Sequence, residues 1–128
     1  MEANQIKMNS NNTQIKWRLV DELIKKSKRI LLTTHENPDG DGLGSERGIY
    51  YHLKEIGKDA RIINCSIHPD VYDFLNEDNI FEYYDPPFHD SWIKAVDLVM
   101  IFDVGDFART RAIARLIKKY NLETINID

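Results

Sequence analysis

Residues 30–45 read Ile30-Leu31-Leu32-Thr33-Thr34-His35-Glu36-Asn37-Pro38-Asp39-Gly40-Asp41-Gly42-Leu43-Gly44-Ser45. The first five are apolar or β-branched without alternation, which is typical of a strand covered on both faces. Pro38 and the glycines then interrupt regular structure before a helical pattern begins. The stretch therefore predicts a strand-to-helix corner, the place where parallel α/β sheets carry their ligand-binding groups.

Two further apolar strands also lead to an acidic residue. Residues 97–102 precede Asp103, and residues 123–127 precede Asp128. A helix over about 42–56 followed by a strand over 61–65 completes a βαβ unit, whose strands are normally parallel. We predict a Rossmann-like α/β fold, with a mostly parallel sheet of about five strands and helices on both faces.

The rest of the chain fits one domain. Residues 1–12 are rich in asparagine and poor in apolar residues, which predicts a disordered leader. A domain over 13–128 follows. It begins with a helix at Thr13 and, besides the helix over 42–56, contains a further helix over about 108–120. For 66–90 we expect a short helix and one weak strand, with Pro86-Pro87 as a breaker. Ile49, Leu53 and Ile56 have core spacing, and Gly57 is placed to end its helix.

Composition excludes several classes of protein. The net charge of -4 argues against tight binding to long duplex nucleic acid, which needs many cationic contacts. No apolar run reaches the roughly 18 residues of a membrane helix, so we expect no membrane partner. The single cysteine, Cys65, permits no intrachain disulfide, and the polar start shows no signal peptide. These features predict a cytoplasmic protein.

Three kinds of loop can be compared with residues 35–45. A calcium loop fails, because the positions that should carry oxygen ligands hold Leu43 and Tyr50. A phosphate-binding loop fails because there is no lysine and because two carboxylates would repel the phosphate. The remaining interpretation is a metal site.

That metal site would use His35, Asp39 and Asp41, with Asp103 arriving from another strand. A mixture of imidazole and mostly carboxylate ligands suits Mn²⁺ first, with Mg²⁺ as the harder alternative. Four ligands, three of them anionic, suit two ions about 3.5–4 Å apart that share a carboxylate. Such a pair activates water toward phosphorus, so hydrolysis of a phosphoester is the expected chemistry.

Two motifs also carry a family resemblance. His35-x-Asn37-Pro38-Asp39-x-Asp41-x-x-Gly44-Ser45 resembles the first motif of the DHH phosphoesterase superfamily, and Asp103-x-x-Asp106-x-x-Arg109 is similar to its second. Asp128 resembles the aspartate that opens the Asp-His-His signature. The residues Gly42 to Ser45 are closer to the oligoribonuclease and phosphoadenosine-phosphate phosphatase branch, the NrnA type, than to family II pyrophosphatases.

The resemblance implies a role for each matching residue. His35 and Asp39 would bind one metal ion and Asp41 the other, with Asp103 as the bridge. Asp103 and Arg109 would be the catalytic residues, with Arg109 meeting a phosphate or pairing with Asp106. The supporting residues would be Asn37, Ser45 and Asp128.

The resemblance also implies substrates and partners. We expect short oligonucleotides or nucleotide phosphates, cleaved as by an oligoribonuclease or exonuclease, and a possible homodimer of the full-length protein. The sequence stops at Asp128, before the two histidines of the signature and the C-terminal domain, so we expect an incomplete domain. The alternatives are a noncatalytic fragment that keeps the fold and partial metal binding, or a pyrophosphatase or cyclic-dinucleotide phosphodiesterase of the same superfamily.

Overall fold

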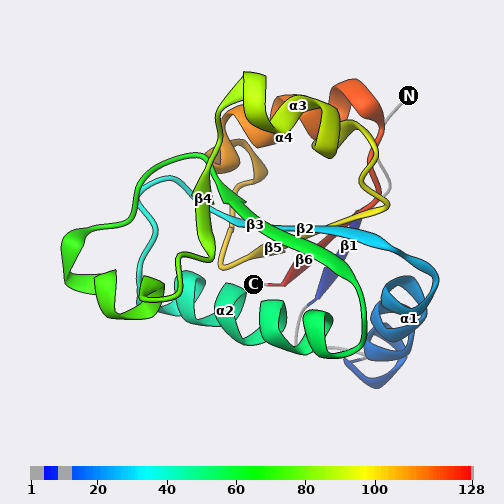
Figure 1. Cartoon of the computed structure of the whole chain (residues 1–128). Coiled ribbons are helices and arrows are strands. Elements are labelled where there is room, and N and C mark those ends of the chain that lie inside the picture. The colour runs from blue at the N-terminus through cyan, green and yellow to red at the C-terminus, as the bar shows by residue number, and fades with distance from the viewer. Residues whose placement is uncertain (1–4, 9–12, 128) are drawn as a thin grey trace.

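The computed structural model describes residues 5–8 and 13–127. In this part of the chain, six strands form one parallel sheet in the order β1-β6-β5-β2-β3-β4 (Figure 1). The strands are β1 (Gln5–Met8), β2 (Arg29–Thr34), β3 (Asp59–Asn64), β4 (Phe81–Tyr83), β5 (Leu98–Phe102) and β6 (Thr124–Ile127). The predicted Rossmann-like parallel sheet is confirmed, with one strand more than the five expected.

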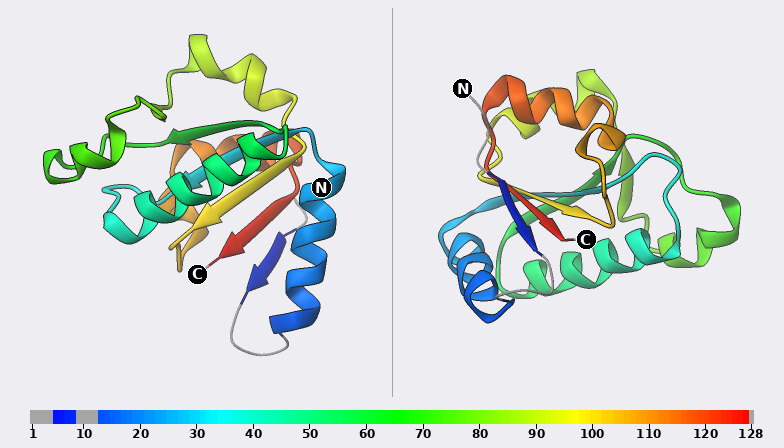
Figure 2. Two further views of the ribbon diagram at one scale, coloured as in Figure 1. Left: turned by 60° about the horizontal axis from the view of Figure 1, so that its bottom comes forward. Right: turned by 180° about the vertical axis from the view of Figure 1, so that it is seen from behind.

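Helices cover both faces of the sheet, as predicted. On one face lie α1 (Thr13–Lys26) and α2 (Gly40–Glu55), and on the other lie α3 (Pro86–Lys94) and α4 (Ala112–Tyr120) (Figures 1 and 2). Two 3₁₀ segments, η1 (Asp70–Asn76) and η2 (Phe107–Thr110), lie in the connections. The sheet is therefore the middle of three layers.

The alternation of side chains along β2 builds two separate cores. Ile30 and Leu32 are fully buried on the side of α1 and α2, where Leu53 of α2 joins them. Leu31 is buried on the opposite side, with Ile93 of α3. Both faces of the strand are covered, which explains why its sequence is continuously apolar.

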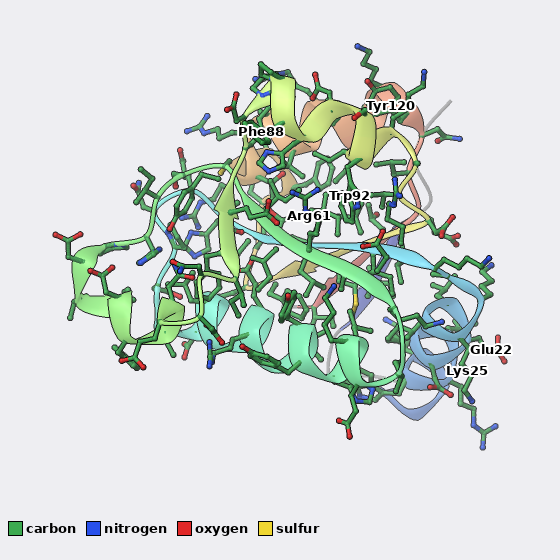
Figure 3. The ribbon with its side chains drawn as sticks, viewed as in Figure 1. Glu22, Lys25, Arg61, Phe88, Trp92 and Tyr120 are labelled. Atoms are coloured by element: carbon green, nitrogen blue, oxygen red, sulfur yellow. The ribbon has the colours of Figure 1, made fainter. Side chains whose placement is uncertain are left out.

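A cation–π contact joins β3 to α3, on the face of the sheet that α3 and α4 cover. Figure 3 shows Arg61 of β3 beside Trp92 of α3, and the guanidinium carbon lies 5.1 Å from the centre of the Trp92 ring. Arg61 also forms a bidentate ion pair with Glu82 of β4. These contacts fasten α3 over the β3–β4 edge of the sheet.

Several local predictions need correction. Residues 5–8 form β1 beside β6, so a leader that is disordered over all of 1–12 is wrong for these four residues; residues 1–4 and 9–12 lie outside the described part. Pro86-Pro87 does not break structure but begins α3, because proline fits the first helical turn, where its missing N–H is not needed. Ile56 is 47% exposed, because α2 ends at Glu55 and turns away at Gly57, whose φ of 84° confirms the predicted glycine cap.

Among the described residues, no helix has the length and apolar character needed to cross a membrane.

Candidate metal centre

The order of the strands reverses between β2 and β5, and we use the name β2–β5 crevice for the region at the carboxyl ends of these two strands, between the loops that follow them. From β2 the chain adds β3 and β4 on one side, and it then returns to place β5 and β6 on the other. The two strands are paired in register up to Thr34 and Phe102, so His35 and Asp103 leave neighbouring strand ends. Ligands of open parallel sheets bind at such a reversal of strand order.

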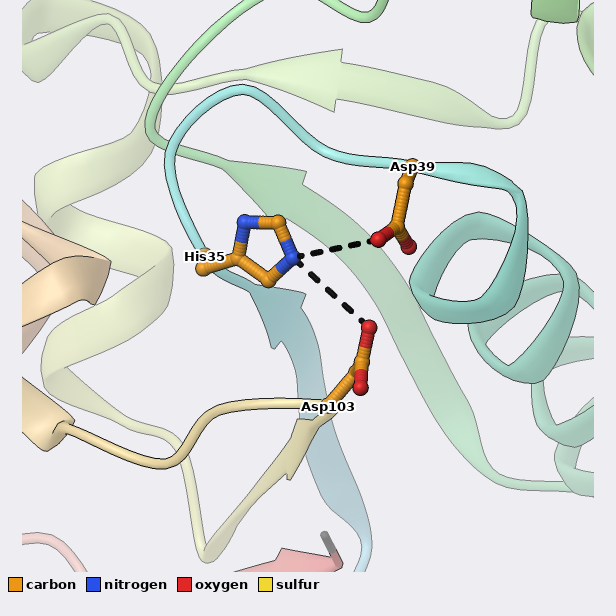
Figure 4. A group of neighbouring side chains, drawn as sticks. All are labelled: His35, Asp39 and Asp103. Atoms are coloured by element: carbon orange, nitrogen blue, oxygen red, sulfur yellow. Dashed lines mark ion pairs between the residues drawn. The ribbon is translucent and has the colours of Figure 1, made fainter.

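Three side chains converge at this crevice, as Figure 4 shows. His35 Nε2 lies 3.8 Å from Asp39 Oδ2 and 3.7 Å from Asp103 Oδ2, and one ligand atom from each residue lies within 4.8 Å of the others. Two ligands about 2.1 Å from a shared ion are at most about 4.2 Å apart. The distances from the imidazole to the two carboxylates are therefore compatible with one divalent cation.

The ring tautomer of His35 favours metal binding. Its side chain is buried, and Nδ1 lies 2.5 Å from the Glu36 carbonyl oxygen, to which it donates as N–H. With the proton on Nδ1, the lone pair of Nε2 is directed at the two carboxylates. A carbonyl that holds the far nitrogen in this way is the usual support for a metal-binding histidine.

The two carboxylates have opposite pKa shifts. The Gly42 amide, which donates to Asp39 Oδ1 at 3.1 Å, lowers the pKa of Asp39. Burial, and then the neighbouring charge of Asp39, raise the pKa of Asp103. Each oxygen thus faces another anion as well as an imidazole, and a bound cation would relieve that repulsion. The residues fit a divalent cation.

Local backbone geometry brings both loops inward. Asp103 has φ of 59° and Asn37 has φ of 52°, a left-handed region that Asp and Asn enter more readily than most residues. Asp103 can therefore turn toward β2 directly after its strand. The backbone N–H of Asn37 donates to Ser66 Oγ at 2.8 Å, which ties the loop to the segment after β3.

Two arginines border the cluster in different ways. Arg109 accepts a hydrogen bond from the Glu36 amide through its carbonyl at 2.9 Å, and its Nη2 lies 3.3 Å from His35 Nδ1. Arg111 forms a bidentate pair with Glu36, with both N···O distances 2.7 Å. Of the two, Arg109 has its guanidinium beside the cluster. Asp106 caps η2 by accepting from the Ala108 amide at 3.0 Å; its carbonyl oxygen accepts from the Arg109 backbone amide at 2.9 Å, but the two side chains form no ion pair.

The other predicted site residues lie outside the cluster of three. Asp41 is exposed in the first turn of α2, but its charge contributes to the raised pKa of Asp103. Ser45 is exposed on α2 and lines an apolar pocket of about 400 Å³ between α1, α2 and the sheet. Asp128 lies outside the described residues.

Two buried polar residues near the site were not predicted. Glu46 of α2 is completely buried, and its carboxyl oxygen Oε1 accepts from the Asn64 side chain at 3.0 Å. A signal was present, because Glu46 occupies the same helical face as Leu43 and Leu53, where an apolar residue is expected. Asn64 similarly ends an apolar strand pattern.

One family model and two known proteins show what this chain is similar to. The family model described as "DHH family, N-terminal domain" matches residues 29–128. The bifunctional oligoribonuclease and PAP phosphatase NrnA of Thermus thermophilus is 40% identical over 72 residues, which cover 56% of this chain and 21% of that protein. The crystal structure of an exopolyphosphatase-related protein from Bacteroides fragilis superposes with a TM-score of 0.83 at 22% identity, covering 94% of this chain and 36% of that one. The chain thus spans well under half the length of either protein.

Proposed function

The chain belongs to the DHH family, because it matches that family's N-terminal domain over residues 29–128. From this premise we propose that it is part of a metal-dependent phosphoesterase that hydrolyses short oligonucleotides or nucleotide phosphates. The observation that carries the proposal is the convergence of His35, Asp39 and Asp103 at the β2–β5 crevice. The similarity to an oligoribonuclease and PAP phosphatase supports the substrate class.

Each residue of the cluster has a defined task in this proposal. His35 offers the Nε2 lone pair, while Asp39 and Asp103 offer carboxylate oxygens to Mn²⁺ or, secondarily, Mg²⁺. In a site with two ions, Asp103 would be a ligand shared by both and Asp41 would be a ligand of the second. Divalent cations in such a site lower the pKa of water and neutralise phosphate charge. Arg109 is placed to donate N–H groups to a phosphate oxygen.

One observation favours a second candidate, a metal-binding module without turnover. The cluster within the described residues holds three ligands, and Asp41 stands apart from it. Three ligands are enough for one ion, whereas the two-ion chemistry needs more. On this alternative the chain keeps the fold and binds one cation.

The rate of dinucleotide hydrolysis in the presence of Mn²⁺, measured for the wild type and for Asp39→Asn, distinguishes these two proposals. Asparagine keeps an oxygen to cap α2 but removes one anionic ligand. We expect any turnover to require Mn²⁺ and to be lost in the variant. Saturable Mn²⁺ binding without turnover would favour the module, and turnover that persists in a strong chelator would contradict both.

A further inference from the structure

Glu46 is a buried acid with an incomplete set of partners. Its side chain projects from α2 into the core and is 0% exposed. Oε1 accepts from Asn64 Nδ2 at 3.0 Å, whereas Oε2 has no hydrogen-bond partner among the described residues. Burial raises the pKa of Glu46 to about 8, so the group is a neutral acid at neutral pH. An apolar side chain would fill this position without leaving a polar atom unsatisfied, so the presence of a carboxyl group needs an explanation.

Asn64 connects this acid to β2. Its Oδ1 accepts from the Thr34 amide at 3.1 Å, and the Thr33 hydroxyl lies 3.5 Å away from the same atom. β2 and β3 are paired in register from Arg29 and Asp59 up to Leu32 and Ile62. The Asn64 side chain therefore takes over at the end of the strand, where the ladder stops.

The orientation of the Asn64 amide depends on Glu46. An amide has one accepting end and one donating end, and the Thr34 amide requires the accepting end. The donating end must then face an acceptor, which Glu46 Oε1 supplies. Without that acceptor, a buried NH₂ group would be unsatisfied, which favours rotation or displacement of the amide.

The chain of hydrogen bonds reaches both metal-binding loops. Thr34 directly precedes His35, and its hydroxyl donates to the Phe102 carbonyl at 2.7 Å. Phe102 in turn directly precedes Asp103. The contacts from Glu46 through Asn64 and Thr34 thus reach the ends of β2 and β5, directly before the metal-binding residues His35 and Asp103.

We propose that Glu46 is a positioning residue, whose carboxyl group fixes the Asn64 amide and thereby sets the placement of His35 relative to Asp103. The inference rests on the proposed function, because it assigns Glu46 a role in metal binding by that same site. The Glu46 carboxyl itself contacts neither metal nor substrate.

The test compares Glu46→Gln with Glu46→Leu. Glutamine keeps an acceptor for Asn64, whereas leucine fills a similar volume without one. In metal-free protein, amide hydrogen exchange at Thr34 should be about tenfold faster in the leucine variant, with Leu31 and Leu32 unchanged. Mn²⁺ affinity, measured by calorimetric titration, should fall about 10- to 100-fold for leucine, as for other groups that support metal ligands. The glutamine variant should match the wild type in both.

Leu53→Ala is the matched control, because Leu53 is a fully buried residue of the same helix. It should lower the melting temperature without weakening Mn²⁺ binding. Asn64→Ala removes the middle of the network and should weaken Mn²⁺ binding as leucine does, which keeps the proposal testable if Glu46→Leu does not fold.

Defined results would overturn the inference. They are an unchanged Thr34 exchange rate in Glu46→Leu, an equal loss of Mn²⁺ affinity in Leu53→Ala, or a glutamine variant as impaired as the leucine one. If wild-type protein binds no Mn²⁺, the proposed function fails instead, and Thr34 exchange still judges the network.

Discussion

The two strand-to-helix corners of the site solve the same problem differently. After β2, Asp39 both caps α2 through the Gly42 amide and faces the metal cluster. After β5 these tasks are divided, because Asp103 faces the cluster while Asp106 caps η2. One corner therefore merges helix stability with metal binding, and the other separates them. Substitutions at the two corners should have different combinations of effects.

The largest expected effect is on metal binding at the second corner. Asp103→Ala removes the carboxylate nearest to both His35 and Asp39, so calorimetry should detect no Mn²⁺ binding to this site. The repulsion between Asp103 and Asp39 disappears, which offsets the strain of alanine at a φ of 59°, so the stability without metal should change by less than about 1 kcal/mol. If Asp103→Ala bound Mn²⁺ with wild-type affinity, Asp103 would not be a metal ligand.

The second prediction concerns pH and applies to the first corner alone. Glu46 has a folded pKa of about 8, above its unfolded value of 4.5. Its contribution to stability is greatest below pH 4.5, falls by about 1.4 kcal/mol per unit as the pH rises, and levels off near pH 8. Asn64 contacts Glu46, and Tyr83, which pairs with His68, lies close enough to be affected by it: burial raises the pKa of Tyr83, and the charges of Asp73 and then Glu46 add to that shift.

Urea unfolding of wild type and Glu46→Gln at pH 5.5 and 7.5 measures this contribution. The free energies of unfolding of the two proteins should diverge by about 2–3 kcal/mol over that interval, in favour of glutamine at the higher pH. Parallel pH profiles would show that Glu46 is ionised in the folded protein.

A smaller effect tests how closely α2 approaches β2 at the first corner. A Cβ at Gly42 would lie 2.6 Å from Thr34 Oγ1, which is held by its hydrogen bond to Phe102. Gly42→Ala should therefore destabilise the protein by about 1–3 kcal/mol. Gly44→Ala is the control in the same helix, because a Cβ there meets no atom within 4 Å. It should stabilise by up to about 1 kcal/mol, and equal effects at both positions would contradict the close approach.

The smallest effect separates capping from metal binding. Asp106→Ala removes the cap of η2 and should cost about 1 kcal/mol in urea unfolding, with Mn²⁺ affinity unchanged. Asp39→Asn should do the reverse, because asparagine caps as well as aspartate but lacks its charge. If Asp106→Ala weakened Mn²⁺ binding as much as Asp39→Asn, the division of tasks at the second corner would be wrong.

The sequence predicted the parts of this architecture that depend on local pattern. The apolar run before His35 and the run before Asp103 identify two buried strands and the residues at their ends. Local pattern does not show which strands become neighbours, so the reversal of order between β2 and β5 comes only from the structure. Asp41 shares its motif with His35 and Asp39 but lies on the exposed side of the first helical turn, which spacing alone did not reveal. The role of Asn64 depends on Glu46, 18 residues earlier in the chain.

The most direct test of the account is Mn²⁺ titration, followed by electron paramagnetic resonance, of wild type, His35→Ala and His52→Ala. His52 is an exposed histidine of α2 and serves as the control for losing an imidazole. We expect saturable binding in the wild type and in His52→Ala, and loss of that binding in His35→Ala. Wild-type affinity in His35→Ala, or equal losses in both variants, would contradict a metal centre at the β2–β5 crevice.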